Sequence, residues 1–182
     1  MLQGLRLHAI VPAFAALQLV AGAPTAAAAE IAAAITAQTS TQAATLEQRL
    51  RRLEDEKAIA SLLLEYGRTL DARDFAAYAA LFSADGEWKG ALGSFKGPKA
   101  IQAEMERIFA GAKDIPKGQN FHSMSNFVID VQGDRATAKS VFVFYQMEGN
   151  KPNATVAGRY EDILVRVNGA WKFQQRNALP PG

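Results

Sequence analysis

The sequence predicts an α+β fold, a cone-shaped barrel in which three N-terminal helices pack on a strongly curved, mainly antiparallel sheet. Apolar residues first recur at intervals of three and four, the period of a helix, and after Pro116 they recur at intervals of two, the period of a strand. Short turn signals separate the later strands, so neighbouring strands run antiparallel. Helices that precede a run of long antiparallel strands are typical of this class.

Residues 1–29 have the layout of a secretory signal peptide. No acidic residue precedes Glu30, Arg6 lies before an apolar run over residues 9–20, and Ala27–Ala29 provide small residues for cleavage. The apolar run is short and weakly flanked for a membrane span. We therefore expect a periplasmic or secreted protein with no stable membrane span after processing, and an uncleaved N-terminal anchor helix is the alternative.

Residues 30–44 consist mainly of Ala, Thr, Gln and Ser, without a periodic set of large apolar residues. Such a composition is typical of a tether without regular structure. The folded domain is then expected to cover residues 45–182. A capping-box spacing at Thr45–Gln48 begins its first helix, which ends near Leu70.

Two shorter helices are predicted next. Asp74 can cap a second helix, which Asp85-Gly86 stops before a short strand at residues 87–89. Gly97-Pro98 opens a third helix, and Gly111 lies where a C-terminal glycine belongs. Its buried stripe is formed by Ile101, Met105 and Ile108.

Four long strands follow, rich in Val, Ile, Phe and Tyr. Glycine-containing turns separate consecutive strands, at Gly133-Asp134, residues 149–152 and Asn168-Gly169. The predicted strands are Phe121 to Val131, Arg135 to Met147, Thr155 to Val167 and Trp171 to Asn177.

Composition excludes several classes of function. The chain has no cysteine, which excludes disulfides, thiolate catalysis and cysteine metal sites. Its 20 Lys and Arg nearly balance 18 Asp and Glu, and the cluster at Arg49, Arg51 and Arg52 lies among acidic residues. The sequence therefore shows no basic patch of the kind that binds nucleic acid. No glycine-rich phosphate loop or GxSxG nucleophile motif is present.

Three sequence blocks carry a resemblance to a known family. They read YGRTLDARDFAAYAALFSADGEW, HSMSNFVIDVQGDRATAKS and GRYEDILVRVNGAWKFQQR. In this order they resemble the SnoaL-like branch of the nuclear transport factor 2-like superfamily, over about Leu53 to Ala178. The resemblance implies a cone with an open mouth and a homodimer formed through the outer sheet face. The superfamily holds enzymes, binding modules and assembly domains, so the fold alone selects none of these functions.

Tyr66 and Asp71 are the inward polar candidates of the first block. Tyr66 shares the apolar stripe of the first helix, and a buried tyrosine hydroxyl needs either another side chain or a ligand as its partner. Similarity to ketosteroid isomerases implies that Tyr66 donates to a substrate oxyanion. Asp74 is explained by a role as a helix cap and Asp85 by a role in a turn, whereas neither structural role explains Asp71. Similarity to scytalone dehydratase implies that Asp71 orients a catalytic histidine.

His122 is the candidate proton carrier. One histidine without HxH or HxxxH spacing cannot form the usual imidazole metal site, but it suffices for acid/base work near neutral pH. Similarity to scytalone dehydratase places a strand histidine at His122, and a structural or exposed histidine is the alternative. The isomerase's general base would fall near Gly90, and the dehydratase's second histidine has no counterpart in residues 135–147.

Aromatic and charged residues supply the substrate-binding candidates. Trp88 and Tyr145 are expected in an aromatic wall, and Arg159 and Asp162 in a polar rim. Strand alternation puts Arg159 on the face opposite Tyr160 and Asp162, and which face lines the pocket stays open.

Together with the resemblance, these residues predict a cofactor-independent lyase or dehydratase, without a metal, that acts on a small hydrophobic, aromatic molecule. Resembled family members that split lignin-derived diaryl compounds make these one class to try. His122, oriented by Asp71, moves the proton, and Tyr66 stabilises negative charge. Three alternatives stay open: a non-catalytic periplasmic ligand-binding or dimerisation module, an isomerase of the ketosteroid type, and an epoxide hydrolase. The last would need Asp71, Asp162 and Arg159 brought together by a bulge.

Overall fold

The computed structural model of the 182-residue chain describes residues 25–112 and 119–181. The chain divides into two compact units, residues 1–44 and 45–182, and the second holds the α+β fold. Its helices are the end of α1 (Ala26–Asp71), α2 (Phe75–Ala79), α3 (Pro98–Phe109) and the short 3₁₀ helix η1 (Ala110–Ala112). None of the helices within the described residues is long and apolar enough to span a membrane. The predicted signal peptide lies largely outside the described residues.

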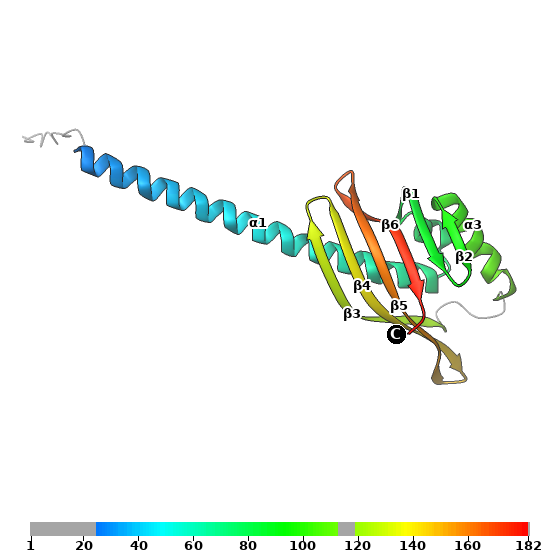
Figure 1. Ribbon diagram of the computed structural model, residues 1–182. Coiled ribbons are helices and arrows are strands. Elements are labelled where there is room, and N and C mark those ends of the chain that lie inside the picture. Colours follow the sequence, from blue (N-terminus) through cyan, green and yellow to red (C-terminus); the bar gives the residue numbers. More distant parts are fainter. Residues whose placement is uncertain (1–24, 113–118, 182) are drawn as a thin grey trace, which may run out of the picture. The chain divides into compact units, whose positions relative to one another are not determined.

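Six strands form a single mixed sheet in the order β2-β1-β6-β5-β4-β3 (Figure 1). Every neighbouring pair is antiparallel except β1 and β6, which run parallel. The strands are β1 (Phe82–Gly90), β2 (Gly93–Lys96), β3 (Phe121–Gln132), β4 (Arg135–Glu148), β5 (Lys151–Val167) and β6 (Ala170–Leu179). The predicted class is confirmed, and the four long strands extend only a few residues beyond the predicted bounds.

Residues 26–44 are helical, so the prediction of an irregular tether is wrong. Alanine has the highest helix propensity, and this segment is rich in it. Its hydroxyl side chains bond back to the helix, as in Thr36 Oγ1 to the Ala32 carbonyl at 2.9 Å and Ser40 Oγ to the Thr36 carbonyl at 2.8 Å. Because α1 continues through Thr45, the predicted helix start there is wrong as well.

The second helix is shorter than predicted. Asp74 caps it, accepting a hydrogen bond from the Ala77 amide at 3.0 Å, but α2 ends at Ala79 and β1 begins at Phe82. Asp85 and Gly86 therefore lie within a strand and do not separate a helix from one. A side chain at position 86 would put its Cβ 2.6 Å from the Phe173 carbonyl oxygen, so glycine is what allows β6 to lie this close.

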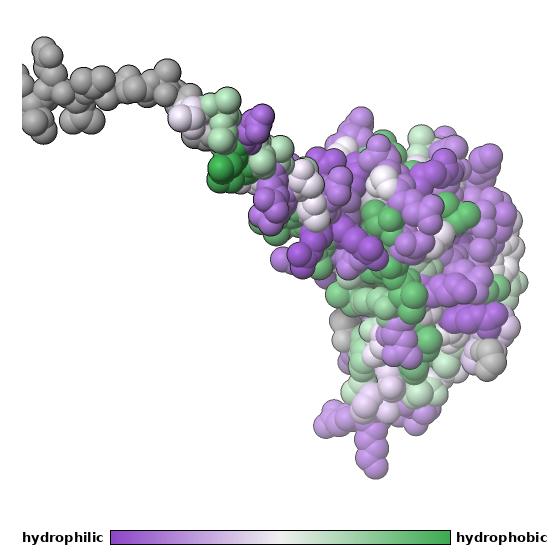
Figure 2. Space-filling view, turned by 60° about the vertical axis from the view of Figure 1, so that its left-hand side comes forward, coloured by the Kyte–Doolittle hydropathy of each residue, from purple (hydrophilic) through white to green (hydrophobic). Residues whose placement is uncertain are grey.

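The core lies between α1 and the inner face of the sheet. Ile59, Leu63 and Tyr66 follow one stripe of α1 and are buried against strand residues that include Leu164 and Phe173. Each such large apolar side chain contributes about 1.5–3 kcal/mol when fully buried. Apolar side chains also reach the surface, where Figure 2 shows them gathered between hydrophilic ones.

A buried polar contact fastens α1 to the β5–β6 hairpin. Asp55 accepts hydrogen bonds from Arg166 Nη2 at 2.6 Å and from Trp171 Nε1 at 3.1 Å, and the Arg166 guanidinium lies over the Trp171 ring at 4.5 Å. Burial acts to raise the pKa of Asp55, but these two hydrogen bonds and the positive charges of Arg166 and Arg51 together outweigh it, and the pKa lies below its ordinary value. This contact holds α1 against the hairpin about four turns before Asp71.

Candidate active site

A cavity of about 910 Å³ opens between the three helices and the inner face of the sheet. Its lining is mainly apolar and includes Leu70, Met105, Phe109 and Phe142, and the volume is within the range of small-molecule sites, roughly 300–1,000 Å³. A much smaller cavity of about 20 Å³ adjoins it and is lined by Asp71, His122 and a few neighbours.

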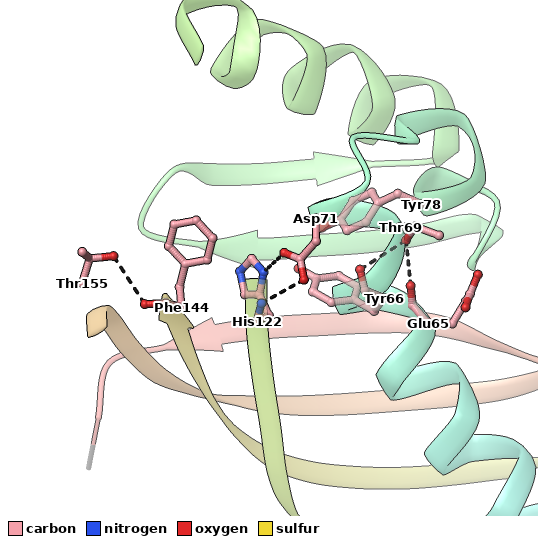
Figure 3. Close-up of polar contacts among 8 residues, drawn as sticks. All are labelled: Glu65, Tyr66, Thr69, Asp71, Tyr78, His122, Phe144 and Thr155. Carbon is pink, nitrogen blue, oxygen red and sulfur yellow. Dashed lines mark hydrogen bonds and ion pairs between the residues drawn. The ribbon is translucent and has the colours of Figure 1, made fainter. Parts of the chain in front are cut away.

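Asp71 and His122 are in direct contact, although 51 residues separate them in the sequence. Asp71 Oδ1 lies 2.5 Å from His122 Nδ1, and Asp71 Oδ2 accepts a hydrogen bond from the His122 backbone amide at 2.8 Å (Figure 3). The two side chains are 17% and 10% exposed, so little water competes for these contacts. The His122 ring also faces Phe144, with ring centroids 4.6 Å apart.

Local backbone features produce this contact. Asp71 ends α1, and one turn earlier a Cβ at Gly67 would lie 3.3 Å from Met124 Sδ and 3.4 Å from His122 Cβ, so the helix and β3 lie close together here. Asn126 has φ 56° at an irregularity in the β3–β4 pairing. Such a bulge changes which residues of a strand face inward. His122 and Met124 therefore face the helix before it, and Phe127 and Ile129 pack against the core after it.

The geometry gives the two imidazole nitrogens of His122 different roles. A carboxylate beside Nδ1 favours the tautomer in which Nδ1 carries the proton and donates it. Nε2 then has a free lone pair, and the His122 ring lines the large cavity. This is the arrangement of an oriented general base.

Tyr66 is the centre of a second polar cluster in the same cavity. Its hydroxyl oxygen accepts hydrogen bonds from Tyr78 Oη at 2.8 Å and from Trp88 Nε1 at 2.9 Å. Since both lone pairs of that oxygen are used, its own proton is left to donate, either to the neighbouring Tyr160 hydroxyl or to a ligand. Burial raises the pKa of Tyr78 and of Tyr160 well above the ordinary value, which keeps both phenols protonated.

Arg176 lies beneath this cluster and was not predicted. Its guanidinium is fully buried, pairs with Asp162 through two hydrogen bonds of 2.8 and 2.7 Å, and lies 3.9 Å from the centre of the Tyr66 ring and 4.1 Å from that of Tyr160. Its Nη1 atom has no hydrogen-bond partner among the described residues. Strict alternation from Phe173 would direct this arginine outward, and a one-residue irregularity in the β5–β6 pairing turns it inward.

The predicted binding residues separate into two groups. Trp88 lines the cavity, whereas Tyr145, Arg159 and Asp162 do not. Tyr145 stacks on Phe121 with ring centroids 5.0 Å apart, and Arg159 donates to the Pro180 carbonyl at 2.9 Å.

The structure also shows which face of β5 points inward, a question that the sequence left open. Tyr160 and Asp162 face inward, but both carboxylate oxygens of Asp162 accept hydrogen bonds from Arg176. Asp71, Asp162 and Arg159 therefore do not meet around one space, and the epoxide hydrolase set is not assembled. Within residues 25–112 and 119–181, no group of three or more metal-ligating side chains could hold a metal ion.

Comparison with known proteins places this geometry in a family. The model of the SnoaL-like domain matches residues 51–177, which is more than half of the chain. Among curated proteins, none matches the sequence. Solved structures share the fold, among them a nuclear transport factor 2-like protein with a cystatin-like fold from Novosphingobium aromaticivorans, which is 25% identical with a TM-score of 0.64 over 73% of this chain and 86% of that one.

Two further similar structures bear more specific names. A candidate scytalone dehydratase from Novosphingobium aromaticivorans is 26% identical, with a TM-score of 0.59 over 71% of this chain and 94% of that one. LinA is 25% identical, with a TM-score of 0.61 over 71% of this chain and 88% of that one. The fold and the extent of the sequence match agree, and the chain belongs to the SnoaL-like domain family of the nuclear transport factor 2-like superfamily.

Proposed function

We propose that the protein is a cofactor-independent lyase of the dehydratase type that acts on a small hydrophobic, aromatic molecule. The observation that carries this proposal is the His122–Asp71 pair, held at 2.5 Å with the imidazole lining an apolar cavity. Similarity to a structure described as a candidate scytalone dehydratase supports the same reaction type.

The chemistry needs only groups that the chain supplies. Nε2 of His122 removes a proton from a carbon next to a substrate carbonyl, and the electron pair moves into an enolate. The Tyr66 hydroxyl donates to the oxygen that becomes negative. The enolate then expels a hydroxyl group from the neighbouring carbon, and the His122 imidazolium gives its proton to that group. A carbon–carbon double bond and one water molecule result, and His122 returns to its neutral state.

The cavity also defines the substrate in general terms. Phe142, Phe144 and Trp88 line it and favour an aromatic ring. Lignin-derived diaryl compounds have that character and are the first class to try. An isomerase is the closest catalytic alternative, because the same proton transfer without a leaving group would shift a double bond.

The test combines ligand identification with a variant of His122. Small molecules retained by the purified protein are identified by mass spectrometry and incubated with it, together with aryl compounds bearing a hydroxyl group β to a carbonyl. Loss of water is the expected product signal. His122→Gln is expected to lower the rate by roughly 10²–10⁴-fold, the usual contribution of a general base, while ligand retention stays.

Glu161→Gln, a change on β5 outside the cavity, serves as the control and is expected to keep the wild-type rate. Unchanged conversion in His122→Gln would refute the proposed base. Retention of a ligand with no conversion by the wild type would favour the non-catalytic binding module instead.

We further propose export to the periplasm or beyond, and assembly as a homodimer through the outer sheet face. The N-terminal sequence pattern supports export. An apolar patch of Phe121, Val141 and the stacked Tyr145 supports the dimer, since Phe121 and Val141 are 40% and 37% exposed. Light scattering is expected to give twice the chain mass, and charge introduced by Val141→Lys is expected to halve it. A monomeric wild type would refute the dimer.

A further inference from the structure

We infer that the cavity takes ligands whose aromatic body carries an anionic group such as a carboxylate, and that Arg73 binds this group. The inference names a substrate class for the site and rests on the function proposed above. Among the described residues that line the large cavity, none is acidic, and the only fixed charges are those of Arg73 and Lys89. An apolar cavity with cations and no carboxylate favours an anionic ligand over a neutral one.

Of the two cavity cations, Arg73 is the one without a carboxylate partner among the described residues. Lys89 Nζ lies 3.0 Å from Glu87 Oε2, so its charge is already balanced. Arg73 forms no ion pair with any carboxylate in the described part of the chain, and its guanidinium lies 6.0 Å from the centre of the Phe109 ring. It lines both the large cavity and the small one that contains Asp71 and His122. An anion bound here would therefore place the rest of the ligand beside the dyad.

The backbone at Arg73 gives a second, independent reason. α1 ends in a Schellman motif: the Arg73 amide donates to the Leu70 carbonyl at 3.0 Å, and the Asp74 amide to the Thr69 carbonyl at 2.9 Å. Arg73 has φ 54°, a left-handed conformation that this motif normally gives to glycine. A long charged residue thus occupies a position that the backbone favours for glycine. Strain of this kind at the rim of a cavity points to a use for the side chain.

The experiment compares two probes of nearly the same shape, naphthalene-2-carboxylate and naphthalene-2-carboxamide. Binding is followed by the fluorescence of Trp88, which lines the cavity, and by calorimetry. The wild type is expected to bind the carboxylate roughly tenfold more tightly at low salt, as for a charge-assisted hydrogen bond. This preference is expected to shrink as sodium chloride is added, because Arg73 is partly exposed.

Arg73→Gly separates the two roles of the position. It is expected to abolish the preference and at the same time to raise the melting temperature by about 2 °C, since glycine relieves the left-handed strain. Arg73→Gln keeps the strain and removes the charge, so it is expected to lose the preference without a gain in stability. Asn168→Gly is the matched control: Asn168 has φ 50° in the β5–β6 turn and does not line the cavity, so the preference is expected to remain.

Equal affinities of the wild type for the two probes, no binding of either, or a preference that survives in both Arg73 variants would overturn the inference. The outcome is separable from that of the catalytic proposal. His122→Gln is expected to keep the carboxylate preference. A carboxylate preference together with no loss of water from the β-hydroxy carbonyl compounds would refute the lyase and leave the anion site standing.

Discussion

Arg176→Met is expected to lower the free energy of unfolding by about 3–5 kcal/mol, the usual effect of removing one partner of a buried ion pair. The substitution leaves the Asp162 carboxylate buried without its counter-charge, because both side chains are 0% exposed. It also removes the cation from the faces of Tyr66, Tyr160 and Phe173. Denaturant unfolding followed by circular dichroism measures the loss.

A double variant distinguishes the unpaired charge from a general packing defect. Arg176→Met combined with Asp162→Leu replaces the pair by apolar side chains, a change that is often neutral or stabilising in other proteins. Most of the lost stability is expected to return. If the double variant is no more stable than the single one, the arginine acts through its contacts with the rings and not by neutralising Asp162.

The same single variant has a predicted pH dependence. Burial raises the pKa of Asp162 above its ordinary value, and the Arg176 guanidinium opposes that rise. A carboxyl group with a raised folded-state pKa costs no stability below its unfolded pKa of about 3.9, and its cost grows as the pH rises through the folded pKa. In Arg176→Met this cost is larger. The difference in stability from wild type is therefore expected to shrink as the pH is lowered toward 4, and a constant difference would contradict it.

Asp71→Asn is expected to lower the rate of the proposed reaction by roughly 10²–10⁴-fold. Asp71 offers two oxygens to two donors of His122, the backbone amide and Nδ1, whereas asparagine offers one oxygen and one NH₂ group. If the oxygen stays with the backbone amide, the NH₂ group faces Nδ1. Nδ1 must then act as an acceptor, the imidazole proton moves to Nε2, and the base toward the cavity is lost.

Nitrogen-15 NMR of the imidazole tests this directly and needs no substrate. We expect Nδ1 to be protonated in the wild type and Nε2 in Asp71→Asn. Asp74→Asn is the matched control three residues away, because asparagine caps a helix as well as aspartate does. It is expected to leave both the tautomer and the rate unchanged. A wild-type rate in Asp71→Asn despite a changed tautomer would show that the dyad is not the catalytic unit.

Stability and chemistry are linked at the floor of the cavity. Arg176 contacts the ring of Tyr66, a residue that lines the cavity where a ligand would lie. A buried cation near that phenol favours any negative charge that develops on or beside it. The ion pair thus stabilises the fold and is placed to assist the proposed oxyanion donor.

The amino-acid sequence alone determined much of the architecture, since its signals are local. Alternating apolar residues and two-residue turns fixed the long strands, and α3 followed from Gly97-Pro98 and its apolar stripe. Local signals failed where two preferences compete. The alanine-rich residues 26–44 have few apolar side chains to bury, yet they form a helix because alanine favours one. Asp85-Gly86 lies at an irregularity inside β1, and pairing with β6 at Phe82 and again from Glu87 onward continues the strand past this turn signal.

The candidate site shows the same division. The sequence, through its family resemblance, singled out Tyr66, Asp71 and His122, and the structure brings the last two into contact. The sequence could not identify Arg176 as a residue beneath the cavity or exclude Arg159 from the binding site. Alternation predicts which face of a strand a residue takes only while the strand has no bulge. A one-residue irregularity depends on pairing with strands distant in sequence. Tertiary structure therefore decided which charges enter the cavity, which are buried beneath it, and which remain outside.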